Sequence, residues 1–177
     1  NPGANSKVDR NQIERYEALF QDAEYCVIQM EIPIDTVEYV ISLCKKKNIK
    51  VMLNPAPAHT LSDEAFKDLY MILPNETELG ILCNNNGSLE EMADHIYNKG
   101  VKNVIVTLGE KGCMLVNNEG VKHFPAPPFS PVDTTAAGDA FVAGMTVGLS
   151  EGMNYEKAIK FASYVAGVTI SREGAQN

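Results

Sequence analysis

The sequence predicts an α/β fold with a mostly parallel sheet, and two observations lead to this prediction. Short apolar runs of strand length alternate with segments in which apolar residues recur at helical spacing. The chain has 177 residues, of which 45% are hydrophobic, and this suits one domain with an ordinary core. Because strands that alternate with helices build parallel sheets, we expect helices to cover both faces of the sheet.

The first half of the chain contains three strand signals, each followed by a helix. The two prolines Pro55 and Pro57 end the second strand, and Ser62 is a plausible N-cap for the helix after it. The third strand is very short and precedes a Pro-Asn turn and an acidic helix start. The strand and helix segments are 23–30 and 34–48, 49–57 and 61–70, and the single stretch 70–83.

The second half continues the alternation and then ends in two helices. Gly100 closes an amphipathic helix, and the NNEG turn joins two strands into a hairpin at one edge of the sheet. An SEGMN break separates the last two helices. The expected segments are a helix in 88–100, a strand in 101–109, a hairpin in 112–126, a helix through about Leu149 and a helix from Tyr155 to about Ile170.

The composition excludes some classes of partner. Lys and Arg number 15 against 23 Asp and Glu, and the formal net charge of -8 repels both a nucleic-acid backbone and an anionic membrane surface. No run approaches the roughly 20 apolar residues that span a bilayer. The four cysteines stand far apart in apolar surroundings, which predicts reduced core thiols in a cytoplasmic protein.

The stretch VDTTAAGDAF is the motif from which a chemical function can be argued most directly. If a helix begins near Ala136, its first amides point the same way and can hold negative charge as it develops on a transferring phosphoryl group. Asp139 could then take the proton from a substrate hydroxyl as a general base. The simpler alternative is that Asp133 caps the helix, Asp139 complements its dipole and Gly138 only permits close packing.

Two further turns have the composition of phosphate and nucleotide sites, although no P-loop or dinucleotide fingerprint is present. TLGEKG offers Gly109 and Gly112 for close backbone contact and Lys111 as a cation, or it is an ordinary solvated turn. PNETE places Asn75 and Glu78 three residues apart at a helix start, where they could reach Mg²⁺ through water. The same pair is also the pattern of a helix N-cap box.

The remaining candidates are a carboxylate and a pair of glycines. QMEIP places Glu31 at a strand end, where it could accept hydrogen bonds from a polyol or simply be solvated. Because ligands of open parallel sheets sit beyond the carboxyl ends of the strands, we expect these polar turns to gather on one rim. Gly144 and Gly148, four residues apart, predict close packing of their helix.

Taken together, these motifs resemble the ribokinase-like (PfkB-type) family of sugar kinases. DTTAAGDAF is close to the second signature of that family, while LNPAPA, PNETE, VTLGEKG and REGAQ look like its ribose-phosphorylating members in order and spacing. The resemblance covers nearly the whole chain. It implies a three-layer α/β/α sandwich that transfers the γ-phosphoryl group of ATP to the 5-hydroxyl of D-ribose, with Mg²⁺ and a monovalent cation such as K⁺.

The resemblance also implies a role for each candidate residue. Asp139 looks like the catalytic base and a sugar contact, and Glu31 looks like another sugar contact. The others resemble an anion hole (Ala136, Ala137 and Gly138), a Mg²⁺ and phosphate motif (Asn75 and Glu78), a nucleotide site (Thr107, Gly109, Gly112, Gly138 and Ser163), and a K⁺ site made of the Asp133 carboxylate and the backbone carbonyls of Thr135, Thr169, Arg172 and Gly174.

This sequence departs from the family in three places. The amino-terminal third of the family, with a Gly-rich sugar motif and the lid through which intact members form homodimers, has no counterpart here. The extreme carboxyl-terminal part is also missing, and Ser163 stands where an Asn or His near the adenine is usual. We therefore expect residues 1–177 to be a truncated single domain, the nucleotide-binding and catalytic core, which binds nucleotide weakly and does not phosphorylate ribose by itself.

Other functions remain open at this point. Fructose, adenosine or another small sugar or nucleoside could replace ribose as the substrate. A non-catalytic, nucleotide-responsive module would share the fold but would be expected to lose Asp139, which is present. A nicotinamide-binding dehydrogenase would show a glycine fingerprint after the first strand, and none is found.

Overall fold

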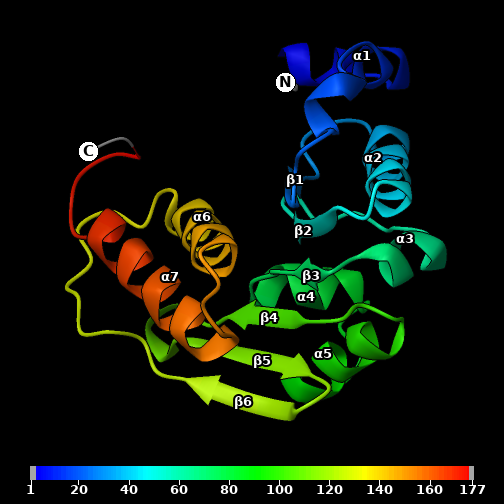
Figure 1. Cartoon of the computed structure of the whole chain (residues 1–177). Helices are drawn as coiled ribbons and strands as arrows, with labels where there is room; N and C mark the ends of the chain where they lie inside the picture. The colour runs from blue at the N-terminus through cyan, green and yellow to red at the C-terminus, as the bar shows by residue number, and fades with distance from the viewer. Residues whose placement is uncertain (1–2, 176–177) are drawn as a thin grey trace. The chain divides into compact units, whose positions relative to one another are not determined.

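The predicted strands form one six-stranded sheet in the computed structural model, which describes residues 3–175 (Figure 1). The strands lie side by side in chain order, and the pairs β1–β2, β2–β3 and β3–β4 are parallel. The prediction of an α/β fold with a mostly parallel sheet is therefore confirmed. The bounds are β1 Tyr25–Gln29, β2 Lys50–Asn54, β3 Met71–Ile72, β4 Val104–Thr107, β5 Cys113–Asn117 and β6 Gly120–Phe124.

Helices occupy every segment for which helical spacing predicted one. Their ends differ from the predicted ends by a few residues, and the predicted cap at Ser62 accepts a hydrogen bond from the Ala65 amide at 3.3 Å. The bounds are α2 Ile34–Lys46, α3 Asp63–Asp68, α4 Glu76–Leu82, α5 Leu89–Asn98, α6 Ala137–Ser150 and α7 Tyr155–Ile170, with the 3₁₀ turn η3 Gly109–Lys111.

The sequence analysis did not predict the helical turns that precede β1. These are η1 Gly3–Lys7, α1 Arg10–Arg15 and η2 Glu17–Phe20. None of their residues is buried, so they show no apolar periodicity from which a helix could be predicted. A local signal does exist, because the Asp9 side chain caps α1 by accepting from the Gln12 amide at 2.8 Å.

The chain forms two compact units. The first is Asn1–Val106 with Leu115–Val121, and the second is Thr107–Met114 with Lys122–Asn177. All six strands contribute residues to the first unit, whereas α6 and α7 lie wholly in the second. The prediction of a single catalytic domain was not tested and stays a prediction.

The core of the first unit is built from consecutive apolar strand residues. Val51, Met52 and Leu53 are all 0% exposed, and because successive strand residues point to opposite faces, both faces of β2 are covered. β1 lies at the end of the strand order, and its Val27 is 46% exposed.

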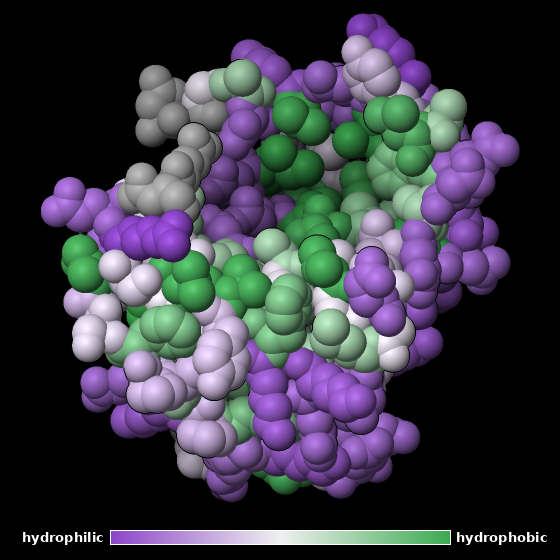
Figure 2. All heavy atoms as spheres, turned by 60° about the vertical axis from the view of Figure 1, so that its left-hand side comes forward, coloured by the Kyte–Doolittle hydropathy of each residue, from purple (hydrophilic) through white to green (hydrophobic). Residues whose placement is uncertain are grey.

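Hydrophobic residues also reach the surface in patches between hydrophilic ones (Figure 2). No helix within residues 3–175 is long and apolar enough to cross a membrane.

Helices α6 and α7 pack side by side in the second unit (Figure 1). A Cβ at Gly144 would lie 2.7 Å from the Cα of Ala162, and a Cβ at Gly148 would lie 3.2 Å from the Cα of Ala158. Both glycines therefore bring the two backbones close together. The prediction of close helix packing is confirmed.

The four cysteines are all free thiols. Cys44, Cys83 and Cys113 are buried as predicted, but Cys26 is only half-buried. A hydrogen bond between the thiols of Cys26 and Cys44 lowers the pKa of Cys26 and raises the pKa of Cys44. Sequence spacing did not reveal this pair, because β1 and α2 bring together residues that are distant in the chain.

Candidate active site

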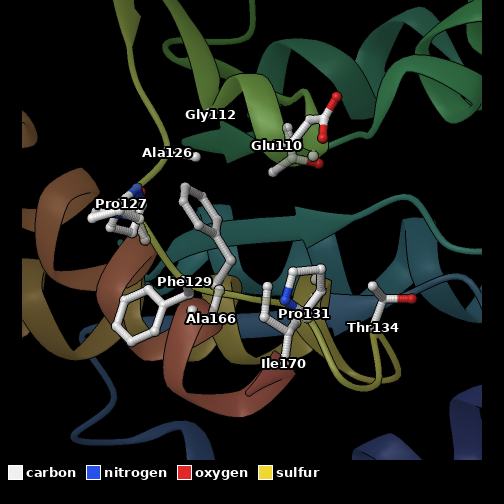
Figure 3. A pocket seen from close by; sticks show the side chains of 17 residues that line it. Glu110, Gly112, Ala126, Pro127, Phe129, Pro131, Thr134, Ala166 and Ile170 are labelled. Atoms are coloured by element: carbon white, nitrogen blue, oxygen red, sulfur yellow. The ribbon is translucent and has the colours of Figure 1, made fainter.

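A cavity of about 640 Å³ lies within the second unit. Its lining comes from the 107–112 turn, the 126–134 segment, the first residues of α6 and the carboxyl-terminal half of α7. Figure 3 shows Phe129, Ala166 and Ile170 on one side of the cavity and Glu110 on the opposite side. The volume is in the range typical of small-molecule sites.

The start of α6 reaches this cavity. The helix begins at Ala137, one residue after the predicted start, and its amide donates to the Thr134 carbonyl at 3.3 Å. Gly138 lines the cavity, and for its amide the described residues offer no hydrogen-bond acceptor. Asp139 follows in the first turn with an exposed side chain. A helix start that lines a cavity and has an amide without a hydrogen-bond acceptor is suited to binding an anion.

The simpler alternative for VDTTAAGDAF is that Asp133 caps the helix, Asp139 complements its dipole and Gly138 only permits close packing. Two of these three parts are wrong. The N-cap of α6 is Ala136, with no side-chain cap, whereas the Asp133 carboxylate accepts from the amides of Thr135 at 2.9 Å and Gly174 at 3.0 Å. A Cβ added at Gly138 would meet nothing within 4 Å, so close packing does not require glycine there. The third part, Asp139 in the first turn beside the helix dipole, is compatible with the structure.

Ala136 has the left-handed conformation, with φ 62° and ψ 12°. This conformation costs a non-glycine residue about 1–2 kcal/mol. Glycine avoids that cost, but its unfolded state has more conformational entropy, and this offsets part of the gain in stability. We expect Ala136→Gly to raise the free energy of unfolding by about 0.5–1 kcal/mol, measured by urea denaturation. Ala140→Gly, inside α6, is the matched control and should lower it by about 1 kcal/mol; destabilisation by both variants would contradict the strain at Ala136.

The 107–112 turn is held by its own backbone. The Leu108 amide donates to the Gly112 carbonyl at 2.8 Å, and the Gly112 amide donates to the Gly109 carbonyl at 3.0 Å. Gly109 and Gly112 have φ values of 57° and 96°, and both line the cavity together with Thr107. Lys111 is not among the lining residues, whereas Glu110 is, so the suggested role of Lys111 as a cation in this site is not supported.

The residues expected to bind a monovalent cation lie around Asp133. Hydrogen bonds from Thr135, first of all its hydroxyl, and from the Gly174 amide hold the pKa of the Asp133 carboxyl below its usual range. The amides of Val132 and Asp133 donate to the Ile170 carbonyl at 2.7 and 3.1 Å. The loop before α6 is thereby tied to the chain after α7.

The donor chemistry of this region fits K⁺, because carboxylate and carbonyl oxygens suit a large, weakly hydrated cation. The Thr169 carbonyl also accepts from the Arg172 amide, at 3.4 Å, so these two expected ligands are neighbours. The REGAQ motif continues past Gly174, but Gln176 lies outside the described residues.

Asn75 and Glu78 belong to the first unit and form the helix N-cap box that their spacing also allowed. The Asn75 side chain accepts from the Glu78 amide and the Glu78 carboxylate accepts from the Asn75 amide, both at 2.8 Å. Burial raises the pKa of the Glu78 carboxyl, and the hydrogen bonds from Asn75 oppose that rise. Because each side chain already binds a backbone amide, contact with Mg²⁺ through water is the mode that fits them.

Glu31 also belongs to the first unit. It is exposed at the end of β1 and accepts a hydrogen bond from the Asn5 side chain at 3.2 Å. It lines a second cavity, of about 590 Å³, together with His59 and Pro33. Glu31 therefore stands in a site large enough for a small polar molecule.

Sequence reasoning missed much of the apolar lining of the first cavity. Ser163, an expected nucleotide contact, lines it, but Phe129, Pro131, Gly167 and Ile170 line it as well. Two signals could have pointed to them, namely the proline-rich stretch that precedes the VDTT motif and a glycine in the interior of a helix. A helix-interior glycine is costly, so it often marks a close approach.

The whole chain matches the family model described as pfkB family carbohydrate kinase, over residues 1–177. A ribokinase from Haemophilus influenzae is 34% identical over 179 residues, which cover 99% of this chain and 58% of that protein. The chain thus spans little more than half the length of this relative.

Two solved structures have the same fold. A ribokinase from Thermotoga maritima is 38% identical with a TM-score of 0.90, and it is matched over 99% of this chain and 59% of its own. A ribokinase from Arabidopsis thaliana, complexed with ribose and ATP, is 28% identical with a TM-score of 0.87 and the same coverage, 99% and 59%.

Proposed function

The chain belongs to the pfkB family of carbohydrate kinases, and from this premise we propose that it is the nucleotide-binding and catalytic core of an enzyme that phosphorylates D-ribose with ATP. The product would be D-ribose 5-phosphate. The proposal is supported by the similarity to ribokinases, one of which was solved with both ribose and ATP.

One observation carries the chemical part of the proposal. The first turn of α6 brings the open Gly138 amide to the cavity, and the exposed Asp139 carboxylate is the next residue. A phosphoryl group held at this helix start would find a backbone donor on one side, and a carboxylate would stand near the attacking hydroxyl.

Asp139 is proposed as the general base. Its carboxylate accepts the proton of the 5-hydroxyl as the sugar oxygen bonds to the γ-phosphorus, and the bond from phosphorus to the bridging oxygen of ADP breaks. Negative charge that develops on the phosphoryl oxygens is met by the Gly138 amide and by the positive end of the α6 dipole. No Lys or Arg is among the described residues that line the cavity, so the backbone is proposed to carry this task there.

The cations remain part of the proposal. When bound, Mg²⁺ would neutralise phosphate charge, and Asn75 and Glu78 would hold it through water. K⁺ would be held by Asp133 and the carbonyls of Thr135, Thr169, Arg172 and Gly174. Because Asp133 is also hydrogen-bonded to Thr135, two residues before Ala137, an ordered cation region would help to fix the start of α6.

The sugar contacts and the oligomeric state are proposed on the basis of the family resemblance. Glu31 and Asp139 are the proposed contacts to sugar hydroxyls. A homodimer formed through a lid outside this sequence and a cytoplasmic location both stay predictions.

The test is ADP release from Mg-ATP by the protein that carries this chain, with ribose, fructose, deoxyribose or adenosine, and with K⁺ or Na⁺ alone. We expect turnover that is selective for ribose and rises with K⁺. Turnover on another acceptor would keep the kinase and change its substrate. ATP binding without turnover on any acceptor would favour a nucleotide-responsive module, and absence of ATP binding would overturn the proposal.

A further inference from the structure

Phe129 and Gly167 are in unusually close contact at the edge of the cavity in the second unit. A Cβ added at Gly167 would lie 2.2 Å from Cδ2 and 2.5 Å from Cε2 of the Phe129 ring. Gly167 is buried in α7, and both residues line the cavity. The ring therefore occupies the volume that any other side chain at Gly167 would need.

The position of the Phe129 ring is fixed from several sides. Its backbone amide donates to the Pro127 carbonyl at 2.9 Å, within a segment in which several prolines restrict the backbone. The ring meets Tyr164 edge to face, with 5.8 Å between the ring centroids and an interplanar angle of 84°. Gly167 and Tyr164 are three residues apart in α7, so they lie on one face of the helix. The ring thus lies against this face of α7 and also lines the cavity.

The surroundings of this ring define one end of the cavity by their chemistry. Phe129, Pro131, Ala166 and Ile170 form an apolar wall (Figure 3), and the nearby polar lining group on α7 is Ser163. A wall of this kind suits a flat, weakly polar heteroaromatic ring, for which an aromatic side chain offers a stacking face. It does not suit a phosphate or a polyol, because these would lose water without gaining hydrogen bonds.

We propose that Phe129 and Gly167 form a size-matched pair that sets the width of the base-binding end of the cavity, with the Phe129 ring as the surface against which the nucleobase stacks. The inference rests on the proposed function, because it assumes that the cavity binds a nucleotide. It assigns to the pair a role in base recognition that is separate from the phosphate chemistry at α6. Any side chain at Gly167 would push the ring toward the base and narrow the site.

The test is a set of variants titrated calorimetrically with ADP and, separately, with inorganic tripolyphosphate, in the protein that carries this chain. Gly167→Ala should weaken ADP binding about 10-fold or more, since a displaced ring removes the stacking contact and blocks the site. Tripolyphosphate, which has no base, should bind with an affinity within about twofold of wild type. Phe129→Leu in the Gly167→Ala background removes ring volume and should recover most of the lost ADP affinity.

Two further variants separate base recognition from a general loss of structure. Gly148→Ala places the same methyl group in the α6–α7 contact but not in the cavity lining, and it should leave ADP binding within about twofold of wild type. Phe129→Ala alone should weaken ADP binding without blocking the site, and this holds even if Gly167→Ala fails to fold.

The outcomes distinguish this inference from the proposed function. If wild type binds ADP and both Gly167→Ala and Phe129→Ala bind it equally well, the pair has no role and the proposed function stands. Equal losses of ADP and tripolyphosphate affinity in folded variants would also overturn the role in base recognition. If wild type does not bind ADP, the inference and the proposed function fail together.

Discussion

Replacing Asp139 by Asn is expected to lower the turnover of ribose by about 10²–10⁴-fold, the usual contribution of a general base. The amide is close to isosteric with the carboxylate but cannot accept the proton of the sugar hydroxyl. The affinity for ADP should stay within a few-fold of wild type, because the amide of residue 138 and the apolar wall are retained. Steady-state kinetics and ADP titration of the same preparation would measure both quantities.

Glu151→Gln is the matched control for this variant. Glu151 is an exposed carboxylate at the opposite end of the same helix, as its C-cap residue. Its neutralisation changes the net charge by the same amount but should leave turnover unchanged. Asp139→Asn also weakens a favourable interaction with the helix dipole, worth about 0.3–1 kcal/mol at an exposed site, so a small loss of stability is expected. Undiminished turnover in Asp139→Asn would remove this residue from the mechanism.

Replacing Gly112 by Ala should produce the largest loss of stability among the changes considered. A Cβ at this position would lie 1.9 Å from the Phe124 carbonyl oxygen and 2.7 Å from the Ala126 nitrogen, and these backbone atoms cannot rotate away. The φ of 96° is also strained for any residue except glycine. We expect the free energy of unfolding to fall by roughly 2–4 kcal/mol, measured by urea denaturation, together with a weaker affinity for ADP.

Gly109→Ala in the same turn separates backbone strain from steric overlap. Gly109 also has a positive φ, 57°, but a Cβ there would meet nothing within 4 Å. The expected loss is only about 1 kcal/mol, the cost of the left-handed conformation. If Gly109→Ala and Gly112→Ala lost equal stability, the close approach of the 124–126 segment would not be what requires glycine at Gly112.

Helices and strands with strong apolar patterns could be predicted because burial imposes those patterns on the sequence. Both faces of β2 are covered, so its residues read as a continuous apolar run. The turns before β1 were not predicted because they bury none of their residues. Their stability depends on local caps such as Asp9, which are short and occur in many contexts.

The candidate site was predictable wherever one continuous stretch of chain forms it. The start of α6, the 107–112 turn and the cap box at Asn75 each follow from consecutive residues. For each motif, the sequence did not show whether its role is in ligand binding or only in local structure. For Asp133, the N-cap at Ala136 and the contact with Gly174, which lies beyond the carboxyl end of α7, show that Asp133 joins two segments rather than capping α6.

The sequence by itself therefore determined the order of strands and helices, the family and the turns that are proposed to bind phosphate, because these depend on short-range hydrogen bonding and on the periodicity of burial. Only the tertiary structure showed the left-handed conformation of Ala136, the backbone contact at Gly112 and the contact between the Phe129 ring and Gly167. In the two glycine contacts, a missing side chain has meaning only through an atom that approaches from another part of the chain. Such an approach leaves no periodic trace in the sequence.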